Sequence, residues 1–201
     1  MAVKVGTSLN YSKDCDVTDQ LLKRRNEYTP DFLDLKLKDY QLVFVYGTLK
    51  TGQKRNSIFK NASYLGEAYT ATTSYIMENS EMDFPVAYHA PISTASASLL
   101  GEIYAVHPMT MLTLDKIESN GEMYERKESW FYLLDQTVKN TKFRPSVKAW
   151  VYLGKEDFWE SYPTTRVPPK KMTLGSGLRP VFDWNPTFSS LEEMWNEKLP
   201  F

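Results

Sequence analysis

Apolar residues gather in short runs along the chain, and each run is followed by glycine, proline or polar positions. The most apolar run, residues 42–46, is rich in β-branched and aromatic side chains and predicts a buried strand. Similar runs predict further strands at residues 64–77, 84–88, 99–106, 130–134 and 147–153.

One helix is expected between two of these strands, at residues 108–118. Pro108 suits the first turn of a helix, and we expect Met109, Leu112 and Ile117 to be its buried positions. Short strands with one inserted helix predict an α+β domain with a mostly antiparallel, barrel-like sheet.

The same pattern divides the chain into three parts. Residues 1–40 form an N-terminal extension, residues 41–155 form the domain, and residues 156–201 form a C-terminal extension rich in proline and glycine. The C-terminal extension carries many aromatic side chains, from Phe158 to Trp195, and so large an apolar area is not expected to remain in water. We therefore expect the extension to pack on the domain or on a protein partner.

Composition and charge exclude several functional classes. The 24 basic and 25 acidic residues give a net charge of -1, so we expect no nucleic-acid partner and no membrane partner. One cysteine, Cys15, and two histidines, His89 and His107, exclude a disulfide framework and predict no metal site. The first residues lack the apolar run of a signal peptide, and a cytoplasmic protein is expected.

A glycine-containing loop follows the first domain strand. In residues 46–54, YGTLKTGQK, a glycine lets the backbone turn sharply and present N–H groups outward. Gly47 and Gly52 have the spacing of a phosphate-binding P-loop, but Gln53 stands at the position of its lysine. A nucleotide-binding protein is therefore the weakest of the functional hypotheses.

This loop resembles the signature of a known family. Residues 43–53, VFVYGTLKTGQ, resemble the γ-glutamylcyclotransferase-like family, and within it the γ-glutamylamine cyclotransferases. The family often has the pattern G-x-x-N after the loop, whereas Gly52 and Asn56 are one residue further apart, which leaves the start of the next helix open. Further segments follow in the family's order and approximate spacing: residues 84–86, 101–106, 114–118, 124–126 and 151–152.

The resemblance implies a fold and a reaction. The fold would be a small mixed or antiparallel β-barrel with flanking helices. The reaction would be an intramolecular acyl transfer, of the lyase or acyltransferase type, in which a γ-glutamyl group cyclises to 5-oxoproline and releases an amine. Ring closure supplies its own proximity, so the enzyme needs a base and an oxyanion site but no cofactor.

The resemblance also implies which residues do this work. It places the general base at Glu118. Two local effects would raise the pKa of this carboxyl, namely its position at the end of a helix and the nearby Asp115. Glu102 is a rival carboxylate to which the family pattern gives no proton-transfer role. The substrate-binding residues would be Tyr46, Gly47, Thr48, Leu49, Pro85, Tyr124 and Tyr152.

Alternatives remain open for these residues and for the protein. Tyr46, Leu49, Tyr124 and Tyr152 can equally serve as packing residues of the core. An enzyme that releases 5-oxoproline is the leading hypothesis; the alternative is a non-catalytic binding or interaction protein on the same fold, to which the long extensions give weight. Among substrates, the sequence does not separate glutathione, γ-glutamyl dipeptides, γ-glutamyl-lysine and other γ-glutamyl amines.

Overall fold

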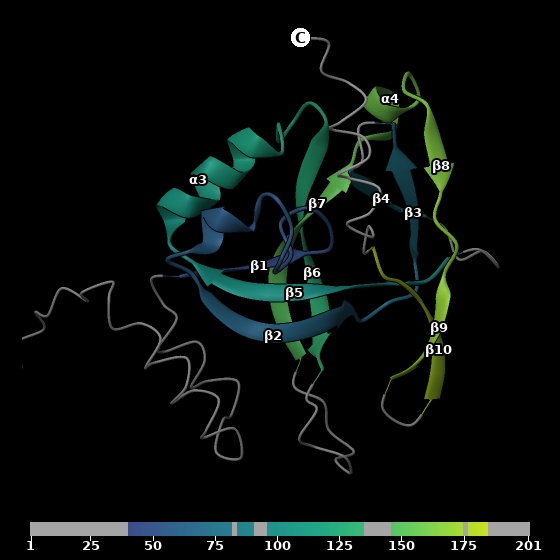
Figure 1. Ribbon diagram of the computed structural model, residues 1–201, viewed down its shortest axis with the longest axis horizontal. Helices are drawn as coiled ribbons and strands as arrows, with labels where there is room; N and C mark the ends of the chain where they lie inside the picture. The colour runs from purple at the N-terminus through teal and green to yellow at the C-terminus, as the bar shows by residue number, and fades with distance from the viewer. Residues whose placement is uncertain (1–39, 82–83, 91–95, 135–145, 175–176, 185–201) are drawn as a thin grey trace, which may run out of the picture.

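The fold is seen in a computed structural model, which describes residues 40–81, 84–90, 96–134, 146–174 and 177–184 (Figure 1). The expected N-terminal extension lies outside these residues, apart from its last position. The C-terminal extension is described only as far as Trp184, so Phe188 and Trp195 also lie outside.

A closed barrel forms the centre of the domain. The first strand, β1 (Gln41–Val45), pairs antiparallel with β5 (Ser98–Val106) on one side and parallel with β7 (Ser146–Gly154) on the other. The ring is completed through β2 (Ser63–Thr70) and β6 (Tyr124–Leu133), with antiparallel pairings. The expected α+β class with a mixed barrel is confirmed.

A second, smaller sheet lies beside the barrel. It contains β4 (Pro85–His89), β3 (Tyr75–Ser80) and β8 (Thr164–Arg166), in that order (Figure 1). The sequence predicted one strand at residues 64–77, and this prediction is wrong because β2 and β3 belong to different sheets. The hydroxyl of Thr70 donates to the carbonyl of Thr72 at 2.8 Å, and this local bond turns the chain between the two strands.

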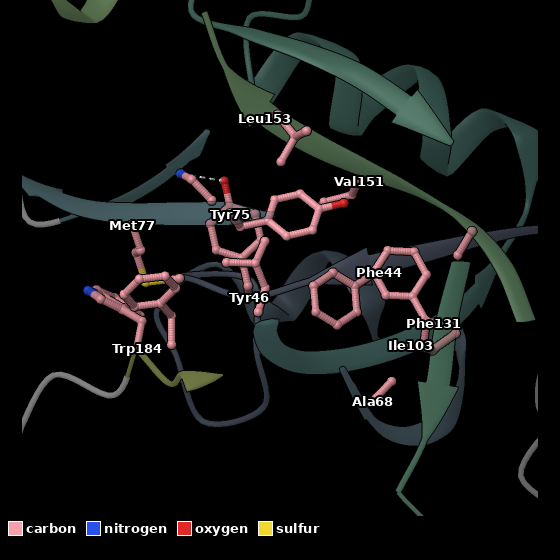
Figure 2. Packing of buried hydrophobic residues seen from close by; sticks show 14 of the residues in the cluster. Phe44, Tyr46, Ala68, Tyr75, Met77, Ile103, Phe131, Val151, Leu153 and Trp184 are labelled. Carbon is pink, nitrogen blue, oxygen red and sulfur yellow. Dashed lines mark hydrogen bonds between the residues drawn. The ribbon is translucent and has the colours of Figure 1, made fainter. Parts of the chain in front are cut away.

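The barrel interior is filled by aromatic and aliphatic side chains (Figure 2). The rings of Phe44 and Phe131 stack with their centroids 4.3 Å apart. Gly101 lies where β5 passes this pair, and a Cβ there would come within 2.1 Å of the carbonyl oxygen of Val45. β1 and β5 can therefore approach closely only because residue 101 has no side chain.

The longest helix of the described residues, α3 (Pro108–Ile117), begins where the sequence predicted. Its N-cap is His107, whose Nδ1 accepts a hydrogen bond from the backbone N–H of Met109 at 3.2 Å. In Figure 1 the helix lies along one side of the barrel, with the β3–β4–β8 sheet on the other side of the view.

The buried face of α3 differs from the expected one. Met109 and Leu112 are 63% and 54% exposed, whereas Met111 and Leu114 are fully buried, so two of the three expected buried positions are wrong. The buried stripe has the spacing i, i+3, i+7 and ends at Glu118, which is the C-cap of the helix. The stripe therefore brings the Glu118 side chain to the face that packs on the barrel.

The described part of the chain after residue 155 adds regular elements to this domain. A short helix, α4 (Glu156–Trp159), follows β7, and a hairpin of β9 (Lys170–Leu174) and β10 (Gly177–Phe182) extends the sheet because β10 pairs parallel with β5. Trp159, Phe182 and Trp184 are buried. No helix within the described ranges is both long and apolar enough to cross a membrane.

Candidate active site

A cavity of about 170 Å³ lies between the loop after β1, the end of α3, the start of β4 and the strands β6 and β7. All eight site residues expected from the sequence line it, so one cavity brings together Glu118, the loop of residues 46–49, Pro85, Tyr124 and Tyr152. The other lining residues are Phe44, Val45, Arg55, Phe84, Ile117 and Met123.

Glu118 is a buried carboxyl group in this cavity. Its side chain is only 12% exposed, and burial raises its pKa from an ordinary 4.5 to about 7. The guanidinium of Arg55 acts in the opposite direction, with Nη1 3.9 Å from Oε1 of Glu118. A carboxyl group with this pKa is half ionised near neutral pH, as a general base requires.

Asp115 does not raise the pKa of Glu118, and that expectation is wrong. Its carboxylate is occupied by other partners: Arg126 Nη1 lies 3.0 Å from Oδ2, while the hydroxyl of Tyr152 donates to Oδ1 at 2.8 Å. Asn120 donates to the same oxygen at 3.1 Å. These bonds fasten the end of α3 to β6 and β7, and they thereby fix the position of Glu118.

The tyrosine hydroxyls of the site serve the fold. The hydroxyl of Tyr46 donates to the carbonyl of Tyr152 at 2.8 Å and accepts from the N–H of Ala87 at 3.2 Å. The hydroxyl of Tyr124 donates to the carbonyl of Pro85 at 3.4 Å. Burial raises the pKa of both Tyr46 and Tyr124 far above the ordinary value, so both remain neutral. The tyrosines of this site form cavity walls as well as core contacts.

The loop after β1 is tightly turned against β4. The N–H of Lys50 donates to the carbonyl of Gly47 at 2.9 Å, and the N–H of Arg55 donates to the carbonyl of Thr48 at 3.0 Å. A Cβ at Gly47 would lie 2.5 Å from Cγ of Pro85, so only glycine permits the loop and Pro85 to meet as they do. Within the described chain, the N–H groups of Thr48 and Leu49 donate to no backbone oxygen.

Glu102, the rival carboxylate, lies outside the cavity lining and accepts hydrogen bonds from the loop. Its Oε2 accepts from the backbone N–H of Thr51 at 2.7 Å, from the Thr51 hydroxyl at 3.0 Å and from the Tyr104 hydroxyl at 2.8 Å. Asn56 then joins Tyr104 to the loop, because its amide donates to both the Tyr104 hydroxyl and the carbonyl of Leu49. Glu102 is therefore a positioning residue for the loop.

Arg55 is the site residue that the sequence reasoning missed. It directly precedes the short 3-10 helix η3 (Asn56–Phe59), which is the element whose start the unusual Gly52–Asn56 spacing left open. The extra residue in this spacing was the available signal, but the sequence alone does not show where the Arg55 side chain points.

Lys50, which lies in the loop but does not line the cavity, was also missed. Its ammonium donates to the carbonyl of Trp184 at 2.8 Å and to Asp183 at 3.1 Å, and these bonds connect the loop to the C-terminal segment.

Comparison with known proteins identifies the family. A family model described as gamma-glutamyl cyclotransferase, AIG2-like, matches residues 43–171, which include every residue of the cavity. The chain belongs to this family.

Individual relatives agree with the family. The chain is 33% identical over 89 residues to the gamma-glutamylaminecyclotransferase of Bos taurus. The match covers 42% of this chain and 52% of the bovine protein. It is 29% identical over 119 residues to the protein of the same name from Homo sapiens. This match covers 55% of this chain and 76% of the human protein. The chain thus spans about half the length of the bovine relative.

Among solved structures, the family fold is represented by an AIG2-like protein from Mus musculus. The match has a TM-score of 0.50 and 25% identity, and it covers 62% of this chain and 84% of the mouse chain.

Proposed function

We propose that the protein cyclises the γ-glutamyl group of a small γ-glutamyl amine or peptide to 5-oxoproline and releases the amine. The observation that carries the proposal is Glu118, a buried carboxyl group with a pKa of about 7, facing a cavity that the loop of residues 46–49 also lines. Family membership supports the reaction class.

The reaction needs from the site a proton acceptor, a proton donor and hydrogen-bond donors for an oxyanion. The α-amine of the substrate attacks its own γ-carbonyl carbon, so that a C–N bond forms and the carbonyl oxygen becomes an oxyanion. Glu118 takes the proton that the α-ammonium loses, and it returns a proton to the leaving nitrogen as the original amide bond breaks. The backbone N–H groups of Thr48 and Leu49, which donate to no backbone oxygen of the described chain, are the available donors for the oxyanion.

The cavity suits a substrate of this size. Its volume of about 170 Å³ is below the range of about 300–1,000 Å³ that is usual for drug-sized ligands, so it fits a group the size of one amino acid. The apolar walls, which include Phe84 and Met123, would fold a flexible γ-glutamyl chain back on itself and exclude water.

We expect the purified protein to release 5-oxoproline from at least one member of a panel of γ-glutamyl compounds. The panel would contain glutathione, a γ-glutamyl dipeptide, γ-glutamyl-ε-lysine and a γ-glutamyl alkylamine, and product would be measured by mass spectrometry. Absence of 5-oxoproline across the panel, together with saturable binding of one of its members, would favour the non-catalytic alternative instead.

The pH dependence follows from the raised pKa of Glu118. A general base must be ionised, so activity is present above a pH of about 7 and is lost as the pH falls through that value. The acid limb of kcat/KM is expected to have its midpoint near pH 7, and to fall about tenfold for each further pH unit. A midpoint near 4.5, the ordinary value for glutamate, would contradict the assignment of Glu118 as base.

A further inference from the structure

Arg55 is the cavity residue to which the proposed chemistry gives no task. Of the described residues that line the cavity, Glu118 and Arg55 alone carry a charge. The Arg55 side chain is 37% exposed whereas that of Glu118 is 12% exposed, so the guanidinium lies nearer to solvent than the carboxyl group does. Arg55 therefore stands on the outer side of the site.

Among the described residues, the guanidinium of Arg55 has ring and charge contacts but no hydrogen-bond acceptor. Its carbon lies 5.3 Å from the centroid of the Phe84 ring, in a cation–π contact, and the backbone N–H of Arg55 is bound to Thr48. The 3.9 Å separation from Glu118 is longer than a hydrogen bond. In the described part of the chain, the guanidinium donates no hydrogen bond to any residue. Its planar set of N–H groups matches a carboxylate in a two-point contact.

The course of the reaction indicates which part of the substrate carries the carboxylate that faces Arg55. The γ-glutamyl group must lie inside the cavity, because its amine has to reach the buried Glu118 and its carbonyl has to face the loop. The substituent on the leaving nitrogen then points outward, towards the solvent side on which Arg55 lies. In an amino acid linked through its α-nitrogen, a carboxylate is attached to the carbon next to that nitrogen. In a simple alkylamine this carboxylate is missing.

We propose that Arg55 is a specificity-determining residue that binds the carboxylate of the leaving amino acid, so that the preferred substrates are γ-glutamyl amino acids or peptides with an anionic group beside the leaving nitrogen. This inference rests on the proposed function and narrows its substrate class. Arg55 touches the leaving group and not the reacting atoms, so its removal alters the choice of substrate more than the chemical step.

The test compares two substrates that differ only in this carboxylate, γ-glutamyl-alanine and γ-glutamyl-ethylamine. The wild-type protein is expected to show a kcat/KM about 10- to 100-fold higher for γ-glutamyl-alanine, which is the usual worth of a charge-assisted hydrogen bond. In Arg55→Met, measured at a pH above the acid limb so that Glu118 is ionised, the preference falls to about threefold or less through the loss of activity on γ-glutamyl-alanine. Arg55→Lys keeps the charge without the planar fork and retains an intermediate preference.

Lys54 provides the matched control. It is the preceding residue of the same loop, it is exposed, and it does not line the cavity. Lys54→Met removes the same formal charge, and it should leave the preference for γ-glutamyl-alanine unchanged. Thermal unfolding of all three variants shows whether each is folded.

The pH profile gives a second measurement, which tests whether the guanidinium of Arg55 lies beside Glu118 in the working site. Among the described residues, the charged and titratable groups that interact with Glu118 are Arg55, Tyr46 and Tyr124, and both tyrosines remain neutral. Because Arg55 lowers the pKa of Glu118, Arg55→Met is expected to move the acid limb of kcat/KM to higher pH.

The outcomes separate the two proposals. Equal wild-type activity on both substrates, or an equal loss on both in Arg55→Met, overturns the role of Arg55 and leaves the cyclisation intact. Absence of product from γ-glutamyl-alanine, while another member of the γ-glutamyl panel reacts, overturns the role of Arg55 alone. Absence of product from both substrates and from the whole panel contradicts the cyclisation itself, and the role of Arg55 falls with it.

Discussion

Glu118→Gln is expected to lower the rate of 5-oxoproline release by about 10²- to 10⁴-fold, the usual contribution of a general base. Glutamine keeps the size of the side chain and its place on the buried stripe of α3, but it cannot accept the proton of the α-ammonium. Substrate binding should change little, because the loop and the apolar walls remain. The measurement is the steady-state rate on the best substrate of the γ-glutamyl panel.

Glu122→Gln is the matched control for this substitution. Glu122 lies four residues further along the chain, is exposed and does not line the cavity, so its loss should leave the rate within about twofold of wild type. If Glu118→Gln retained the wild-type rate, the base would have to be another group and the proposed mechanism would be wrong.

Glu118→Gln should also be more stable than the wild-type protein at alkaline pH. The pKa of Glu118 is higher in the folded protein than the ordinary 4.5, so the folded state is destabilised relative to the unfolded state as the pH rises through about 7. A neutral glutamine does not carry this cost. Thermal unfolding at pH 8 should therefore give a higher Tm for Glu118→Gln, in the manner of an active-site residue that trades stability for activity.

Gly101→Ala is expected to have the largest effect on stability. The added Cβ would lie 2.1 Å from the carbonyl oxygen of Val45 and 2.7 Å from the ring of Phe44, which is closer than atoms can approach without a shift of the backbone. β1 and β5 would have to separate at a point where the barrel is closed. We expect the free energy of unfolding to fall by about 3 kcal/mol, and Tm to fall by about 6–12 °C.

Gly177→Ala is the control for Gly101→Ala. Gly177 is also the residue of a strand, β10, but a Cβ built on it meets no atom within 4 Å. Its replacement should leave Tm within about 2 °C of wild type. A Tm for Gly101→Ala that matches the Gly177→Ala value would show that the barrel can widen at this point without cost.

The sequence predicted most of the elements because their signals are local. The run of residues 42–46 is apolar and β-branched, which is enough to identify β1, and Pro108 is enough to mark the start of α3. The break between β2 and β3 was missed because no glycine or proline marks it. It depends on the Thr70 hydroxyl bond, which is visible only in the folded chain.

The candidate site divides in the same way. The resemblance to the family supplied Glu118 and the loop, because these residues belong to motifs with a fixed spacing. It did not supply Arg55, whose importance depends on the direction of a side chain rather than on its spacing. Nor did it show that Asp115 pairs with Arg126, because a partner eleven residues away on another element cannot be inferred from helix spacing.

The buried bond between Tyr46 and the carbonyl of Tyr152 has a consequence for the newly synthesised chain. The two residues are 106 positions apart, so at about 5–20 residues per second a ribosome needs about 5–20 s to pass from one to the other. During this interval β1 first lacks both partners, because β5 ends at Val106, and then it can pair with β5 but not with β7, so no cavity exists. The most apolar strand of the protein is therefore exposed on one edge until nearly the whole domain has been made, which is the period when this chain is most open to mispairing.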